Sequence, residues 1–134
     1  MKTRPCASGD ARKRITAARK FLEVAELYLN DSDLEGRRVA VSNAVHAGIA
    51  ASDAICCAVL GEHAVGDDHQ AAAKLLASVG RQATEPARAL GALLRVKSKA
   101  QYQTSTIGKP DAAAAVRRAA ALVEAAETIV FSTA

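Results

Sequence analysis

The chain has 134 residues, of which half are hydrophobic and only 3% aromatic, and its formal net charge is +4. This length fits one domain with a single core, spanning residues 1–134. With three cysteines, no disulfide framework or metal quartet can be recognised, and free cysteines favour a reducing, cytoplasmic location.

Alanine supplies much of the hydrophobic half. It has the best helix propensity of all residues, so the composition favours helices over sheets. Alanine also buries little area, so such a core needs close helix–helix contact and gains stability from oligomerisation. We therefore expect a homodimer.

No segment predicts a signal peptide or a membrane span. The N-terminus lacks a continuous apolar segment, and His46 and Asp53 interrupt the most apolar window. We expect a cytoplasmic protein that does not insert into membranes.

Residues 1–9 predict a flexible basic lead, because they include Pro5, Ser8 and Gly9. Asp10 is expected to cap a first helix that runs to about Asn30, whose inner face carries apolar residues at spacings of three and four.

The second helix is predicted from Ser32 or Asp33, as its cap, to Gly61. It is apolar nearly all round, which is typical of a helix covered on several sides. Ala44 and Gly48 lie on one face and leave it smooth, so another helix can approach closely. We interpret this helix as the inner one of a bundle.

Three further helices are expected: a short one from His69 to about Val79, one from Thr84 to about Thr104, and one from Pro110 to about Val130. No strand-like alternation is visible. The sequence therefore predicts an all-α fold, an antiparallel up-and-down bundle of four long helices and one short helix.

Two polar residues in the second helix, His46 and Asp53, are predicted to be buried. A neutral, hydrogen-bonded histidine is the simpler role for His46, and a ligand or catalytic role is the alternative. Because a lone buried carboxylate is costly, we expect Asp53 to bond Lys97 or Tyr102 of the fourth helix.

The loop before the short helix contains His63 and the run Asp67-Asp68-His69. Helix capping explains Asp68, and one histidine beside two aspartates fits no known metal spacing. We expect His63 to be exposed, and we expect no metal and no cofactor.

Positive charge clusters near the N-terminus, over residues 95–99 and at Arg117-Arg118. Such clusters are typical of nucleic-acid contacts. They are also typical of a solvated surface. The charge pattern leaves both interpretations open.

Several segments together resemble the HEPN superfamily of small helical bundles. They are the alanine-rich run from Ala44 to Ala54, the Gly-x-Asp-His start of the short helix from Gly66 to His69, and the basic segment from Leu93 to Tyr102. With the first helix and the Ala/Val-rich last helix, the resemblance covers most of the chain.

Many HEPN proteins are metal-independent ribonucleases, often toxins paired with a small nucleotidyltransferase, and two copies of their Arg…His motif meet across a dimer. Arg95 and Tyr102 are spaced here as in the Arg-x4-His-x-Tyr version, but Ala100 occupies the histidine position. An alignment to the Arg-x-x-Ala-Asp-Tyr version places Lys97 at the arginine and Gln101 at the acid, again without a histidine.

The resemblance implies a non-catalytic protein that binds RNA, a nucleotide or a partner protein through one face of the fourth helix. That face comprises Arg95, Lys97, Lys99 and Tyr102. One alternative is a ribonuclease toxin in which His46 or His69 replaces the missing histidine, with a nucleotidyltransferase-type antitoxin as partner. Another is a structural assembly subunit.

Overall fold

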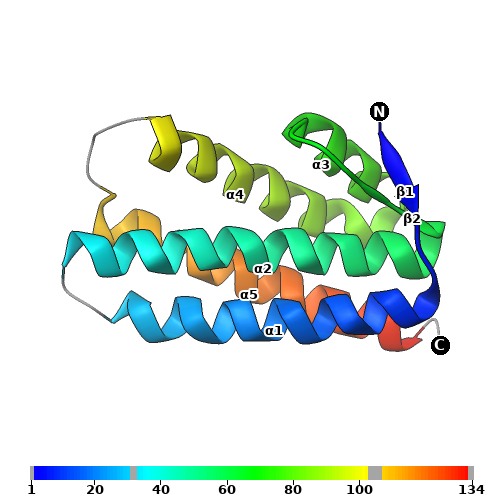
Figure 1. The fold of residues 1–134 in the computed structure, drawn as a ribbon, viewed down its shortest axis with the longest axis horizontal. Coiled ribbons are helices and arrows are strands. Elements are labelled where there is room, and N and C mark those ends of the chain that lie inside the picture. Colours follow the sequence, from blue (N-terminus) through cyan, green and yellow to red (C-terminus); the bar gives the residue numbers. More distant parts are fainter. Residues whose placement is uncertain (1, 31–32, 103–106, 133–134) are drawn as a thin grey trace.

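The computed structural model describes residues 2–30, 33–102 and 107–132, with the side chains of residues 98–102 outside the described set. Within this part of the chain, four long α-helices and one short one account for most residues, and consecutive long helices run in opposite directions (Figure 1). The all-α antiparallel bundle is thus confirmed. The helices are α1 (Ser8–Leu29), α2 (Leu34–Leu60), α3 (His69–Ala77), α4 (Thr84–Tyr102) and α5 (Lys109–Ser132).

Helix α2 is the inner helix of the bundle, as predicted, and it contacts each of the other four. Asp33 caps its first turn, where the Gly36 amide donates to Asp33 Oδ1 at 2.6 Å. Gly61 ends the helix in the left-handed conformation, with φ of 72°.

Gly48 is where α2 approaches its neighbours most closely. A Cβ placed on it would lie 2.6 Å from Leu93 Cδ1 of α4 and 3.5 Å from Leu122 Cδ2 of α5. The missing side chain therefore lets three helices pack together at this level.

The shorter elements follow local capping signals. Asp68 caps α3 by accepting the Ala71 amide at 3.0 Å. Helix α3 ends at Ala77, two residues before the predicted Val79, and a short 3-10 turn over Arg81–Ala83 leads into α4. The predicted end of α4 at about Thr104 lies outside the described residues.

The prediction of a flexible N-terminal lead is wrong for the described residues. Strand β1 (Thr3–Pro5) pairs antiparallel with strand β2 (Glu62–Ala64), with Arg4 opposite His63. These strands are three residues long, too short to show an alternating pattern in the sequence. The lead is thereby attached to the segment that follows α2.

Helix α2 is also long and apolar enough, by length and composition, to cross a membrane. More than half of its most apolar stretch is buried by the rest of the bundle. Its hydrophobicity therefore has a sufficient explanation in its central position.

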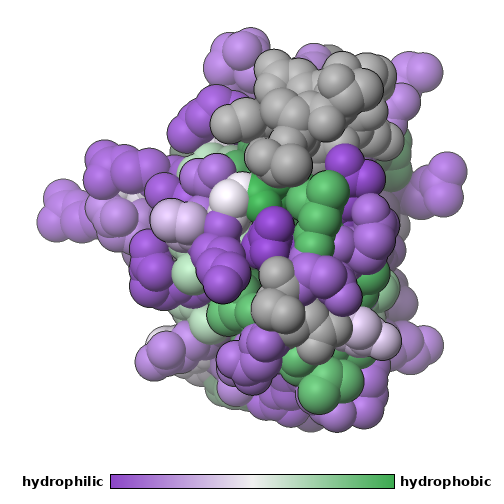
Figure 2. All heavy atoms as spheres, turned by 90° about the vertical axis from the view of Figure 1, so that its left-hand side faces the viewer, coloured by the Kyte–Doolittle hydropathy of each residue, from purple (hydrophilic) through white to green (hydrophobic). Residues whose placement is uncertain are grey.

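Figure 2 shows the end of the bundle where α1 connects to α2 and α4 connects to α5. Hydrophilic side chains dominate the described surface at this end, and apolar ones show in separate patches between them.

Candidate functional site

Four arginines line one groove between α4 and α5. Arg88 and Arg95 come from α4, and Arg117 and Arg118 come from α5. All four are exposed, and the groove has a volume of about 460 Å³. Small side chains make up much of its wall: Ala89, Ala92, Ala121 and Ala125.

The charge of this groove is strongly positive. Glu85 is the acidic residue that lines it, and its carboxylate pairs with Arg88 Nη1 at 2.7 Å. Arg95, Arg117 and Arg118 make no ion pair with any residue in the described part of the chain. Guanidinium groups bind phosphate and carboxylate oxygens through paired N–H donors, so the groove suits a phosphorylated ligand.

A second groove runs along the other side of α4, against α3. It has a volume of about 550 Å³ and is lined by His69, Lys74, Gly91 and Arg95, among others. Arg95 therefore borders both grooves. His69, predicted as a candidate site residue, lies in the second one.

A small cavity of about 90 Å³ brings together three of the predicted residues, Asp53, His69 and Lys97. Asp67 lines it as well, and the apolar part of its wall comes from α2, α3 and α4. Lys97 and Asp53 thus face a common space, but no hydrogen bond joins them.

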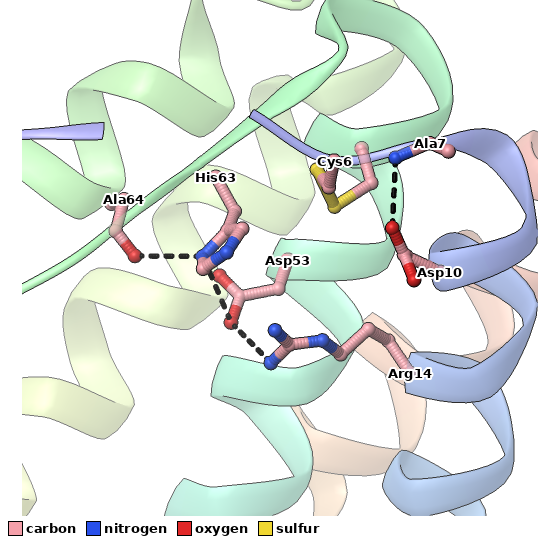
Figure 3. Close-up of a disulfide and its surroundings, with 8 residues drawn as sticks. Cys6, Ala7, Asp10, Arg14, Asp53, His63 and Ala64 are labelled. Carbon is pink, nitrogen blue, oxygen red and sulfur yellow. Dashed lines mark hydrogen bonds and ion pairs between the residues drawn. A yellow bond between two sulfur atoms is a disulfide. The ribbon is translucent and has the colours of Figure 1, made fainter. Parts of the chain in front are cut away.

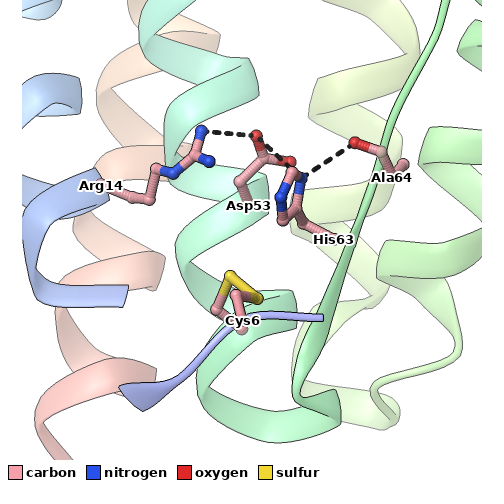
Figure 4. A network of polar contacts seen from close by, with 6 residues as sticks. Cys6, Arg14, Asp53, His63 and Ala64 are labelled. Atoms are coloured by element: carbon pink, nitrogen blue, oxygen red, sulfur yellow. Dashed lines mark hydrogen bonds and ion pairs between the residues drawn. A yellow bond between two sulfur atoms is a disulfide. The ribbon is translucent and has the colours of Figure 1, made fainter. Parts of the chain in front are cut away.

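Asp53 bonds to a different helix than predicted. Arg14 Nη1 of α1 donates to Asp53 Oδ2 at 3.3 Å, and His63 Nδ1 of β2 lies 4.0 Å from the same oxygen (Figures 3 and 4). The prediction of Lys97 as its partner is wrong, and the side chain of Tyr102 lies outside the described set. The expected exposure of His63 is also wrong, because this side chain is 11% exposed.

Burial dominates the electrostatics of Asp53, whose side chain is 14% exposed. Loss of solvent raises the pKa of its carboxyl from 3.8 to about 6, against the smaller lowering effects of His63 and Arg14. The ion pair with Arg14 thus offsets only part of the cost of burying this charge.

His46 is exposed, which corrects its predicted burial. Its ring lies 5.3 Å from the ring of Phe21 on α1. His46 and Asp53 share nearly the same face of α2, but the cavity that encloses Asp53 is built by β2, α3 and α4 around the last turns of α2. His46 lies two turns before Asp53 and does not line that cavity.

The sequence predicted free cysteines, and this prediction is wrong for two of the three. Cys6 and Cys57 form a disulfide that fastens the end of β1 to α2 (Figure 3). Because disulfides persist mainly in oxidising compartments, this bond removes the reason for expecting a reducing one. Cys56 is free and buried, and burial raises the pKa of its thiol to about 12, so it is not a reactive thiolate.

Three of the predicted residues, Arg95, Lys97 and His69, line these grooves or the small cavity, whereas Lys99 lies with Tyr102 among the residues whose side chains are not described. Arg88 was not predicted, although a position seven residues before Arg95 shares its helix face. In the described residues, no three His, Cys, Asp or Glu side chains could hold a metal ion.

Comparisons of the chain with family models, with curated proteins and with solved structures found no match. The resemblance to the HEPN superfamily therefore stays a prediction from the sequence. The chemistry of the site has to be inferred from its own residues.

Proposed function

We propose that the protein binds the phosphate groups of RNA or of a nucleotide through the groove between α4 and α5, without cleaving them. The observation that supports this is the convergence of four arginines from two helices on one groove, where Glu85 supplies the one carboxylate among the described lining residues. The HEPN resemblance of the segment that begins at Arg95, with Ala100 at the histidine position, supports binding rather than catalysis.

The groove can hold a phosphate without large rearrangement. Its alanine walls leave room between the arginines, and exposed guanidinium groups lose less hydration on binding than ammonium groups do. The ligand's charge would be neutralised by several cations at once, so affinity should fall steeply with salt.

The test is a fluorescence anisotropy titration of labelled RNA at salt concentrations between about 50 and 200 mM. The variant with Arg117→Ala and Arg118→Ala should bind more weakly and lower the salt slope by about two. The matched control carries Lys13→Ala and Lys20→Ala, which remove the same charge from exposed positions on α1.

Equal weakening by the two double variants would show a general charge effect and contradict the groove as the site. Absence of polyanion binding by the unaltered protein would contradict the proposal as a whole. That result would favour a structural assembly subunit.

A metal-independent ribonuclease is the second candidate, because His69 and Lys97 line one cavity beside Asp53. An imidazole near a bound phosphate can act as general acid or base. Total RNA incubated with the protein in a chelator separates the two functions. Cleavage that disappears with His69→Ala would establish the ribonuclease, and a nucleotidyltransferase-type antitoxin would then be the expected partner.

A further inference from the structure

Arg95 occupies a special position, because it borders the grooves on both sides of α4. In the groove against α5 it lies with Arg117 and Arg118, and in the groove against α3 it lies with His69 and Lys74. The two grooves are therefore separated only by the outer face of α4.

On the outer face of α4, only small side chains separate Arg88 from Arg95 at the surface. Gly91 lines the α3 side and Ala92 lines the α5 side, so no bulky side chain rises between Arg88 and Arg95. Arg95 folds back over these small residues, since its Nη1 lies 3.5 Å from where a Cβ on Gly91 would be. A ligand can cross α4 here and touch the Arg95 guanidinium as it does so.

We infer that the two grooves form one continuous path for a nucleic-acid chain that crosses α4 at Gly91 and Ala92. This inference rests on the proposed function and specifies its ligand as a chain of nucleotides, not a single one. The chain's phosphates meet Lys74 on the α3 side, Arg95 at the crossing, and Arg117 on the α5 side.

The lining also specifies how the chain is recognised. Among the described residues, no Phe, Tyr or Trp side chain lines either groove. Proteins that read unpaired bases stack them on aromatic rings, each worth about 1–3 kcal/mol. The path therefore recognises the phosphate backbone and is indifferent to base sequence.

The experiment compares a short and a long probe on one blocking variant. Gly91→Leu places a side chain at the crossing, and leucine is a better helix former than glycine, so the fold is retained. An oligouridylate of about 16 nucleotides should bind about tenfold more weakly to this variant, while ADP, which also has Arg117 and Arg118 beside it, loses much less affinity. Ser42→Leu, at an exposed position on α2, is the control and should leave both probes unaffected.

A second variant, Lys74→Ala, tests the α3 side alone. It should weaken the oligouridylate and leave ADP unaffected, whereas Arg117→Ala should weaken both probes. If the oligouridylate binds to Gly91→Leu or to Lys74→Ala as tightly as to the unaltered protein, the continuous path is wrong and the groove between α4 and α5 acts alone. If the unaltered protein binds neither probe, the proposed function fails and this inference with it.

Discussion

Replacing Asp53 by asparagine should stabilise the protein at neutral pH and leave its stability nearly unchanged in acid. Asparagine keeps the shape of the side chain and an oxygen that can accept from Arg14. It removes the charge whose burial raises the pKa of Asp53 to about 6. Arg14 is itself 39% exposed, so losing the ion pair does not leave a buried cation without a partner.

The size and direction of this change in unfolding free energy follow from proton binding. In the unfolded chain Asp53 loses its proton near its ordinary pKa of 3.8, whereas in the folded protein it keeps the proton up to about pH 6. Between these values the folded state binds more protons, so its stability falls as the pH rises. At about 1.4 kcal/mol per pH unit, ionised Asp53 costs at most about 3 kcal/mol at neutral pH.

The assay is urea unfolding of the oxidised protein and the Asp53→Asn variant from about pH 4.5 to 8. The variant's advantage in unfolding free energy should grow through this window to about 1–3 kcal/mol. His63, His69, Asp67 and Lys97 also surround the carboxylate, and comparing the two proteins at each pH largely cancels their own titration.

Glu124→Gln, at an exposed position on α5, is the control and should show no such pH-dependent gain. A variant that becomes less stable than the unaltered protein as the pH rises would show that the ion pair with Arg14 outweighs burial. Burial would then not dominate the contribution of Asp53 to stability.

Three other outcomes are expected. Gly48→Ala should destabilise the fold by about 1 kcal/mol, because crowding Leu93 costs about 1–3 kcal/mol against a helix-propensity gain of about 1 kcal/mol; an unchanged urea midpoint would mean that Leu93 moves aside freely. Reducing the Cys6–Cys57 bond, which spans 51 positions, should cost about 4 kcal/mol, and a Tm insensitive to reductant would contradict this. Light scattering should give twice the 13.9 kDa of one chain, and a monomer mass at micromolar concentration would exclude the predicted homodimer.

The helices were predictable because their signals are local. Asp33 and Gly61 mark both ends of α2, and Gly48 identifies the face on which other helices pack. Capping and helical period depend on residues a few positions apart, so a single sequence contains them.

The polar contacts were not predictable, because they depend on which elements meet. Asp53 pairs with Arg14, which is 39 positions away, and no local sequence pattern around either residue indicates this pairing. Likewise, two adjacent cysteines on one helix do not show which of them Cys6 reaches. Asp53 is largely buried and His46 is exposed, because Asp53 borders the cavity lined by residues of β2, α3 and α4, and His46 does not.

The link between Cys6 and Cys57 also determines how tension passes through the molecule. A force applied to the two chain ends enters at β1, crosses the sulfur bridge to α2, and continues through α3, α4 and α5. Helix α1 and most of α2 lie inside a closed covalent ring and bear no load. When the oxidised protein is stretched, its end-to-end length should therefore stay roughly 170 Å shorter than that of the fully extended chain, at about 3.3–3.6 Å for each of 51 positions. Reduction of the disulfide should release this length.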